Sequence, residues 1–400
     1  MMKLNILVMG TGGSQKDTFI NRRLKALASI GMEVITPVSG NLEMDPGISN
    51  RVKTLWMDKH RSLFSYLRDW VLFGIQHPYR SLRLLRALLA QSQSIVEFLV
   101  LSTNALQLAR LDPDIVHFEW NSAAVDHKWM FDYFDCPTVI SCRGRQVNIW
   151  PHMPGKEKFI QDLKDTFKKT SAVHCVSRSV LQECLGLGLA PRKGNVIYTA
   201  VDTGFYTPNP NRTTKQDKAI HITMVGALIW RKGFEYAIMA LKSLLDQGLD
   251  VYLDIVGDGP ELDRIEYTAK DLNIFERVNL IGRLDPDQVR DALWQADIFL
   301  LTSLSEGIAN VVVEAMSCGL PIVSTDCGGM REAITEGVEG FLVPVRDGAA
   351  TAAALMRLIK DPQLRVAMGA AGRQRALRSF TLETQAEKFC DLYQRLIGLP

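Results

Sequence analysis

Short apolar runs alternate along this chain with longer segments whose apolar residues recur at helical spacing. Alternation of this kind is typical of parallel strands with helices on both faces of a sheet. The runs lie at residues 4–9, 115–118, 138–141 and 172–176 in the first half, and at 221–225, 251–256, 278–281, 298–301 and 321–324 in the second. The pattern therefore predicts an α/β protein.

Residues 207–218 interrupt this alternation, because they are rich in Pro, Asn, Thr and Lys and lack apolar periodicity. We interpret this segment as an interdomain linker. A chain of 400 residues also exceeds the size at which one hydrophobic core keeps growing. We therefore expect two doubly wound domains, residues 1–206 and a second from 207, whose ligand crevices at the strand C-termini face one cleft.

Charge and cysteine spacing narrow the class of protein. A net charge of +2 gives no reason to expect a nucleic-acid partner. Seven cysteines without Cys-x-x-Cys spacing favour a reducing compartment over a disulfide framework or a zinc site. The histidines lack the pairings of metal-binding helices, so we expect no metal and no cofactor.

No apolar run reaches the roughly 18 residues that a transmembrane helix needs. The first residues lead into a short strand and do not form a signal peptide. We therefore expect a cytoplasmic protein that is neither secreted nor membrane-spanning.

The most informative segment is residues 305–329, where Glu306 and Glu314 stand on either side of a predicted turn-to-helix junction. Unpaired amides at a helix start attract anions, and Gly307 lets the chain approach a phosphate closely. A diphosphate therefore fits the segment that comprises Gly307, Ile308, Ala309, Asn310 and Val311.

The two carboxylates would repel a phosphate, so they make sense as acceptors for hydroxyl groups. Asn310 and Glu314 lie one helical turn apart on one face, so Glu314 points back toward the helix start. We expect Glu314 to accept from a ribose and Glu306 from a sugar beyond the diphosphate. The competing interpretation is a pair of solvated carboxylates without function.

This segment resembles the retaining glycosyltransferases of family 4, which carry two glutamates separated by seven residues, then a Gly-Leu-Pro strand and a Gly-Gly turn. The corresponding parts here are Glu306 to Glu314, Gly319 to Val323, and Gly328-Gly329. The resemblance implies the GT-B fold, in which two Rossmann-like domains face a central cleft. It also implies a donor domain at 207–381 and a last helix, 382–400, that crosses back to the first domain.

In the second domain the resemblance places Lys232 at a strand-to-helix turn, where an ammonium can neutralise a departing diphosphate. Ala227 stands where the family often has an arginine, and Arg231 is the candidate for that second positive charge. The family holds the base on a backbone that corresponds to Gly282, Arg283 and Leu284, and Gly328 would line the phosphate crevice. Ordinary strand-exit turns are the competing interpretation of both segments.

In the first domain, a glycine-rich loop follows the strand at residues 4–9. The family has a similar loop near the donor diphosphate, which indicates Gly12, Gly13 and Ser14 as donor-binding residues; a structural turn is the alternative. Arg143 replaces a family histidine after the strand at 138–141. An arginine cannot act as a base, but it can bind a donor sugar or phosphate through two hydrogen bonds.

Residues 51–90 interleave Lys and Arg with aromatic residues. Such a segment can lie on an anionic bilayer, here the inner face of the membrane, or it can form helices that pack on the domain with their charges exposed. Peripheral membrane contact is therefore one of two interpretations.

Together these features predict a metal-independent, retaining hexosyltransferase. It would move a hexose from a nucleoside diphosphate sugar to a hydroxyl of a glycan or glycolipid in polysaccharide biosynthesis. UDP-glucose is favoured on family frequency, with GDP-mannose behind it. A nucleotide-sugar epimerase and a catalytically silent nucleotide-sugar-binding subunit remain as alternatives.

Overall fold

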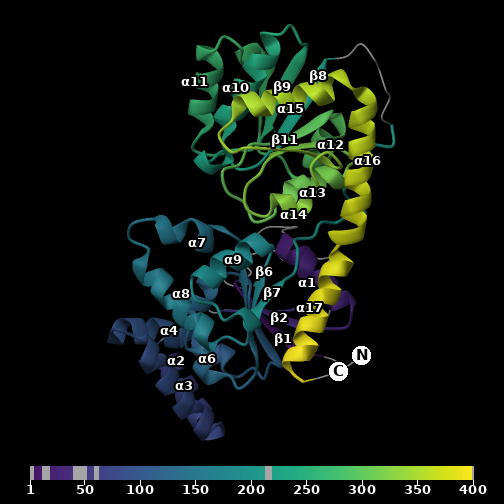
Figure 1. Cartoon of the computed structure of the whole chain (residues 1–400). Coiled ribbons are helices and arrows are strands. Elements are labelled where there is room, and N and C mark those ends of the chain that lie inside the picture. Colours follow the sequence, from purple (N-terminus) through teal and green to yellow (C-terminus); the bar gives the residue numbers. More distant parts are fainter. Residues whose placement is uncertain (1–3, 11–18, 39–51, 58–62, 212–218, 399–400) are drawn as a thin grey trace. The chain divides into compact units, whose positions relative to one another are not determined.

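The computed structural model describes residues 4–10, 19–38, 52–57, 63–211 and 219–398. The chain divides into two compact units (Figure 1). Unit 1 comprises Met1–Val176, Leu181–Ile197 and Ala386–Pro400, and unit 2 comprises Ser177–Val180 and Tyr198–Gln385. No helix in the described ranges is both long and apolar enough to cross a bilayer.

Unit 1 is built on a parallel sheet with the order β3-β2-β1-β4-β5-β6-β7. Its strands are β1 Asn5–Met9, β2 Glu33–Val38, β3 Val52–Trp56, β4 Ile115–Phe118, β5 Thr138–Cys142, β6 Ala172–Cys175 and β7 Gly194–Val196. The chain moves outward from β1 in one direction and returns to the other side at β4. The strand order therefore reverses between β1 and β4.

The helices of unit 1 connect these strands and cover the sheet (Figure 1). They are α1 Phe19–Ser29, α2 Leu63–Gln76, α3 Pro78–Gln91, α4 Ile95–Leu108, α5 Asn121–Asp126, α6 Met130–Tyr133, α7 Arg145–Asn148, α8 Glu157–Lys169, most of α9 Arg178–Gly186, and most of α17 Leu382–Leu396. Side chains from β1, α1 and α17 share one buried apolar cluster, so the end of the chain packs on the first strand.

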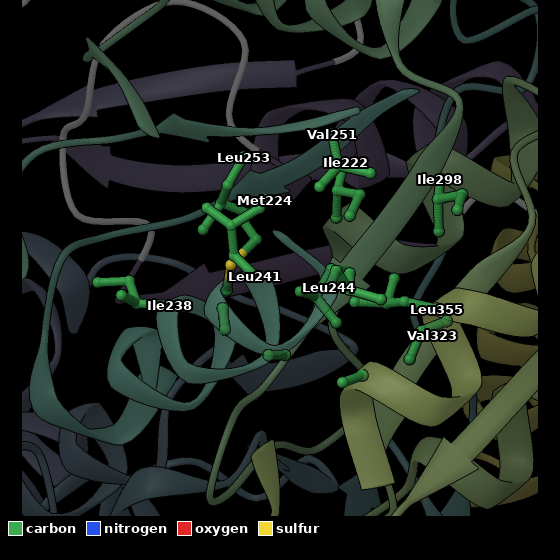
Figure 2. Packing of buried hydrophobic residues seen from close by; sticks show 14 of the residues in the cluster. Ile222, Met224, Ile238, Leu241, Leu244, Val251, Leu253, Ile298, Val323 and Leu355 are labelled. Carbon is green, nitrogen blue, oxygen red and sulfur yellow. The ribbon is translucent and has the colours of Figure 1, made fainter. Parts of the chain in front are cut away.

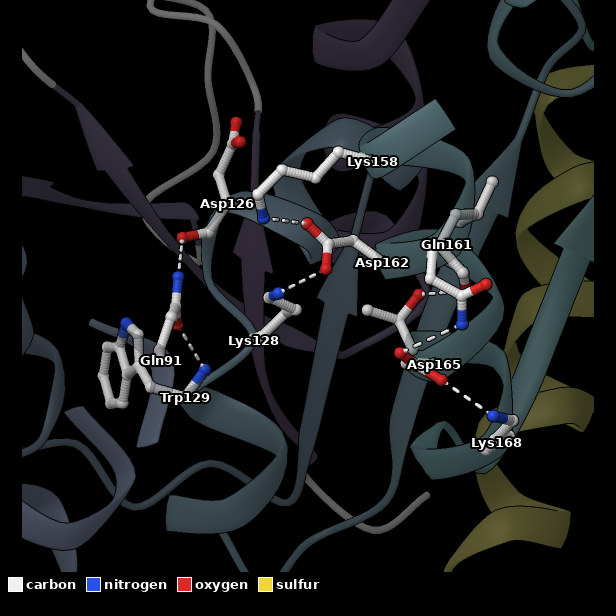
Figure 3. Close-up of polar contacts among 11 residues, drawn as sticks. Gln91, Asp126, Lys128, Trp129, Lys158, Gln161, Asp162, Asp165 and Lys168 are labelled. Carbon is white, nitrogen blue, oxygen red and sulfur yellow. Dashed lines mark hydrogen bonds and ion pairs between the residues drawn. The ribbon is translucent and has the colours of Figure 1, made fainter. Parts of the chain in front are cut away.

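Polar contacts fix α3 against the body of unit 1 (Figure 3). The Gln91 side chain donates to the Asp126 carbonyl at 2.9 Å and accepts from the Trp129 amide at 2.8 Å. Asp162 of α8 accepts from Lys128 at 2.8 Å and from Lys158 at 3.1 Å. Gln91 thus attaches the end of α3, and Lys128 attaches α8, to the segment where α5 ends and α6 begins.

A directional chain of hydrogen bonds crosses the buried centre of unit 1. His174 donates through Nε2 to the Ile197 carbonyl at 2.8 Å, so its Nδ1 accepts from the Ser141 hydroxyl at 2.7 Å. Ser141 in turn accepts from His117 Nε2 at 2.8 Å, and His117 Nδ1 accepts from the Tyr393 hydroxyl at 2.6 Å. Both imidazoles must be neutral for this order to hold. The chain ties α17 to β4, β5 and β6.

Unit 2 contains a second parallel sheet with the order β10-β9-β8-β11-β12-β13. Its strands are β8 Ile220–Val225, β9 Val251–Val256, β10 Val278–Gly282, β11 Ile298–Leu301, β12 Ile322–Thr325 and β13 Gly340–Val343. Its helices are α10 Phe234–Leu245, α11 Leu262–Asp271, α12 Pro286–Gln295, α13 Asn310–Ser317, α14 Met330–Ala333, α15 Gly348–Lys360 and α16 Pro362–Ser379.

Helices cover both faces of this sheet, as the alternation along β11 shows. Ile298 and Leu300 belong to a core with α10 and α15, whereas Phe299 and Leu301 belong to a core with α12 and α13. Successive strand side chains point to opposite faces, so each face is buried separately. Figure 2 shows the first core, in which residues of β8, β9, α10 and α15 interdigitate.

The two parallel sheets with their helices confirm the predicted α/β class. The sequence pattern does not predict β2, β3, β7 or β13. Of these, β3, β7 and β13 are edge strands, and β2 contains Pro37, so none forms a clear apolar run.

The predicted domain boundary after residue 206 and the structural division after Ile197 differ by the segment 198–206. That segment packs on unit 2. Val201 and Tyr206 are buried in its core, and Arg373 of α16 donates to the Tyr206 carbonyl at 2.8 Å.

Acid should destabilise unit 1 through its buried histidines. Burial lowers the pKa of His117 and His174 well below the ordinary value of 6.5, and the cation of Arg23 or Arg143 lowers it further. The unfolded chain therefore binds more protons, and stability falls as the pH drops below about 6.5. Each histidine contributes a slope of about 1.4 kcal/mol per pH unit in that range.

Thermal or urea unfolding followed from about pH 7 to about pH 5 measures this slope. His174→Gln removes one of the two buried imidazoles and should reduce the slope of unfolding free energy against pH by about 1.4 kcal/mol per pH unit. Equal slopes for wild type and His174→Gln would contradict the assignment.

Candidate functional site

The strand order of unit 2 reverses between β8 and β11, which are neighbours in the sheet. In open α/β sheets, ligands bind outside the carboxyl ends of the strands at such a reversal. Here these ends carry residues 226–233 after β8 and residues 302–309 after β11. The sheet therefore brings the predicted Lys232 and Glu306 loops together.

Hydrogen bonds to backbone carbonyls hold the two loops against each other. The Leu304 amide donates to the Arg231 carbonyl at 2.7 Å, and the Thr302 hydroxyl donates to the Lys232 carbonyl at 3.0 Å. Gly233 adopts φ 62°, and a Cβ there would lie 2.4 Å from the Thr302 carbonyl oxygen. Only glycine allows this close approach.

Lys232 and Glu306 form the polar centre of the site. Lys232 Nζ lies 2.6 Å from Glu306 Oε1, and their side chains are only 13% and 10% exposed. The lysine stem runs past Gly226, where a Cβ would come within 3.4 Å of Lys232 Cε. The carboxylate neutralises the ammonium. An anion bound at this place would compete with Glu306 for the Lys232 ammonium.

A third loop, which follows β12, packs against the Glu306 backbone. Gly328 has φ 54°, and a Cβ there would lie 1.8 Å from the Glu306 carbonyl oxygen. The Gly329 amide donates to the Gly307 carbonyl at 2.7 Å. The Gly-Gly turn thus fixes the path of the chain through Glu306 and Gly307.

Helix α13 begins directly after the loop that follows β11, and the start of the helix has unpaired backbone donors among the described residues. Ala309 is the N-cap residue and supplies no side-chain acceptor. In the described part of the chain, the amides of residues 307–311 donate to no acceptor. Five such amides at a helix start form an anion-binding arrangement.

The polar residues of α13 differ in their surroundings. Asn310 accepts a hydrogen bond from the Thr199 hydroxyl through its side-chain oxygen, so its side chain is engaged within unit 2. Glu314 lies one turn further along the same face and is half-buried. Ile308 and Ala309 are buried, so they contribute backbone and packing only.

The predicted base-binding turn connects to this centre through backbone contacts. The Gly257 amide donates to the Gly282 carbonyl at 2.8 Å, and a Cβ on Gly257 would lie 1.9 Å from the Gly226 carbonyl oxygen. Arg283 is exposed and Leu284 is half-buried beside it. The loops after β8, β9 and β10 therefore form one continuous edge that leads to Lys232.

Arg231 and Cys327 complete the surroundings. The Arg231 side chain is half-buried and makes no hydrogen bond to another described residue. Burial raises the pKa of Cys327 to about 11, and the Glu306 carboxylate adds to this effect. The Cys327 thiol is therefore protonated near neutral pH and supplies no thiolate.

Unit 1 has a separate polar cluster where its own strand order reverses. Arg143 donates to a Glu119 carboxylate oxygen at 2.6 Å and lies over the Trp120 ring at 5.4 Å. Glu119 is fully buried and also pairs with Arg23. Burial lowers the pKa of Arg143 to about 10 and that of Arg23 to about 9, so both stay charged near neutral pH.

Glu119 and Trp120 are not among the residues predicted from the sequence. Their position directly after the apolar strand at 115–118 is the signal that could have indicated them. Of the other predicted residues in this unit, Gly12, Gly13 and Ser14 lie outside the described residues. Among the residues that are described, no group of three or more His, Cys, Asp or Glu side chains could hold a metal ion.

Two adjoining family models match the chain. Residues 206–375 match the model described as glycosyl transferases group 1, and residues 74–205 match glycosyltransferase family 4. A curated relative, the phosphatidylinositol N-acetylglucosaminyltransferase gpi3 subunit of Schizosaccharomyces pombe, is 31% identical over 189 residues. That match covers 47% of this chain and spans only 41% of the relative's length.

Solved structures of glycosyltransferases share the whole fold. Sucrose-phosphate synthase of Thermosynechococcus elongatus superposes with a TM-score of 0.77 at 17% identity, and the match covers 99% of both chains. HepE of Anabaena, solved with UDP-glucose, gives a TM-score of 0.71 at 17% identity over 98% of this chain and all of that one. The chain belongs to the family 4 glycosyltransferases and has the GT-B fold.

Gly328 offers a direct test of how the loops are held. Gly328→Ala places a methyl group on the Glu306 carbonyl oxygen, so the loop must shift. Gly337→Ala is the matched control, since Gly337 also has a positive φ of 78° but has no atom within 4 Å of a Cβ. We expect Gly328→Ala to destabilise the protein by about 1–3 kcal/mol more than Gly337→Ala in urea unfolding. Equal losses would show that the turn is not tightly packed.

Proposed function

We propose that this protein is a retaining, metal-independent hexosyltransferase. It takes a hexose from a nucleoside diphosphate sugar and attaches it to a hydroxyl of a glycan or glycolipid in polysaccharide biosynthesis. The observation that carries this proposal is the group of unpaired amides at residues 307–311, beside the Lys232–Glu306 pair at the strand-order reversal of unit 2. Family membership supports a transfer reaction at that place.

The residues have distinct roles in this proposal. The amides of 307–311 and the Lys232 ammonium bind the diphosphate and stabilise the charge that develops on it as the glycosidic bond breaks. Arg231 adds positive charge nearby. The Glu306 carboxylate, once Lys232 turns to the phosphate, accepts a hydrogen bond from a hydroxyl of the donor sugar.

Glu314, one turn into α13, accepts from the ribose hydroxyls, and the edge at Gly282–Leu284 holds the base. Arg143 in unit 1 binds a sugar or phosphate oxygen with the orientation that Glu119 and Trp120 impose. The leaving phosphate accepts the proton of the attacking hydroxyl, so no protein nucleophile is required. Each of these assignments can be tested by substitution.

UDP-glucose is the proposed donor, with GDP-mannose as the competitor. The protein is proposed to act in the cytoplasm, with residues 51–90 in contact with the inner face of the membrane. A nucleotide-sugar epimerase would share the nucleotide site but would change the donor without an acceptor. Product analysis after incubation with donor alone separates the two.

The donor site can be tested by thermal shift with UDP-glucose, GDP-mannose and the two free diphosphates. A ligand at 100 times its dissociation constant adds about 2.7 kcal/mol to stability. We expect UDP-glucose and UDP to raise the melting temperature and GDP-mannose to have a smaller effect. A larger shift with GDP-mannose would overturn the choice of donor, and no shift with any nucleotide would overturn the donor site.

Substitution of the central pair tests the mechanism. Lys232→Ala removes the cation beside the diphosphate, and Glu306→Ala removes the proposed sugar acceptor. Loss of one preorganised group of this kind typically lowers kcat by about 10²–10³-fold. Lys270→Ala removes an exposed lysine paired with Glu266 in the same unit and serves as the control. Initial rates of nucleotide release give the result, and unchanged turnover in both site variants would defeat the assignment.

A further inference from the structure

Helices α2, α3 and α4 of unit 1 pack against one another and lie together at one end of the unit (Figure 1). Their inner sides are anchored. The Tyr66 hydroxyl of α2 bonds Ser102 of α4 at 2.5 Å, and Arg83 of α3 donates to the Asp132 carbonyl at 2.8 Å. Phe73 and Leu84 are fully buried on this side. The three helices therefore already have a packed inner side.

Their outer sides are also apolar. On each helix, large apolar side chains recur every three or four residues and are exposed to solvent. We call this set the outer apolar face: Phe64, Leu67, Val71, Leu72 and Ile75 on α2; Tyr79, Leu82, Leu85 and Leu89 on α3; Ile95, Val96, Leu99 and Val100 on α4.

The exposures within this face are large. Phe64 is 78% exposed, Ile75 73% and Ile95 80%. Single exposed apolar residues are normal, but thirteen large apolar side chains exposed on three helices that pack together indicate an interaction surface. A helix that is apolar on opposite sides is buried on both in its working state. The outer apolar face extends to Val100, beyond the segment 51–90 that the sequence pattern singled out.

Charges on these helices indicate what kind of partner binds to the outer apolar face. Residues 63–110 contain arginines and no lysine, and guanidinium groups bind phosphate through two hydrogen bonds. Arg80 and Arg83 pair with Asp112 and Asp135, whereas Arg86 is exposed and makes no ion pair within the described residues.

The three helices carry two carboxylates, Asp69 and Glu97. Asp69 is 7% exposed, and Glu97 is half-buried and accepts from the Gln93 amide at 2.7 Å. Repulsion between these helices and an anionic surface is therefore small. Long aliphatic side chains with arginines nearby and so few accessible carboxylates complement the acyl region and phosphate headgroups of a lipid bilayer.

We propose that the outer apolar face of α2, α3 and α4 inserts into the surface of an anionic bilayer, with the helices lying in the plane of the membrane. No described helix can span a bilayer, which is consistent with in-plane binding. The stripe on α2 from Phe64 to Ile75 covers about 16 Å, which is three helical turns of buried contact. Arginines such as Arg86 bind the phosphate groups at the edge.

This surface specifies the class of acceptor, a step that rests on the proposed transferase function. A bilayer-bound enzyme meets its acceptor in two dimensions when the acceptor is itself anchored by an acyl or isoprenoid chain. The acceptor hydroxyl therefore belongs to a lipid-linked saccharide, and a free oligosaccharide is a poorer substrate.

Vesicle flotation with the full chain tests the proposal. The vesicles contain phosphatidylcholine with or without phosphatidylglycerol. We expect the wild type to bind the anionic vesicles more tightly, and Val71→Glu/Ile75→Glu to reduce the bound fraction by at least about tenfold, because charges are expelled from the acyl region. Val100→Glu should act in the same direction and tests the part of the face on α4.

The matched control is Val366→Glu on α16, since Val366 is 64% exposed and Val71 is 61% exposed. It should float as the wild type does. All variants should keep the thermal shift with UDP-glucose, so loss of vesicle binding is separable from failure of the donor site. Equal flotation of wild type and the α2 double variant would overturn the proposal. So would a wild-type dimer in sedimentation analysis that the double variant abolishes without any vesicle binding, because a second copy would then cover the face.

Discussion

The central constraint in this protein is that backbone amides at the start of α13 have no acceptor among the residues that the structure describes. Buried or half-buried amides normally find a partner, and the chain at residues 307–311 is held in position by the neighbouring loops. A Cβ at Gly328 would overlap the Glu306 carbonyl oxygen, and a Cβ at Gly233 would overlap the Thr302 carbonyl oxygen. Glycine is therefore required at both positions where the three loops meet. The packing of the three loops thus sets the geometry of these amides.

The Lys232–Glu306 pair fits this constraint. The Glu306 carboxylate neutralises a lysine that would otherwise be a poorly solvated cation. The same two groups are those that a diphosphate sugar needs, one for its phosphate and one for its sugar hydroxyls. Unit 1 has a comparable arrangement, in which the buried Glu119 holds Arg143 and Arg23 in place. In both units a carboxylate fixes basic side chains at the point where the strand order reverses.

Much of this could be predicted from the sequence, because apolar runs and glycine-rich turns are local signals. The strands of unit 2 other than β13, the start of α13 and the positions of Lys232 and Glu306 follow from such patterns. The direct ion pair between those two residues could not be predicted, since they are far apart in sequence and only the adjacency of β8 and β11 brings them together. Glu119 belongs to no motif, and its partners Arg143 and Arg23 are also distant in sequence, so it was not predicted.

The outer apolar face was only partly predicted. The sequence of α4 is that of an ordinary core helix, and only the structure shows that its apolar side chains are exposed.

The most direct test of the central claim is a nuclear magnetic resonance titration of the labelled protein with UDP, observing the backbone amides of residues 307–311. The account predicts that the chemical shifts of these amides change together. Their changes should saturate at the UDP concentration at which the resonances of UDP itself show that the protein is fully bound. Saturation of the protein with UDP while these amides remain unchanged would contradict it.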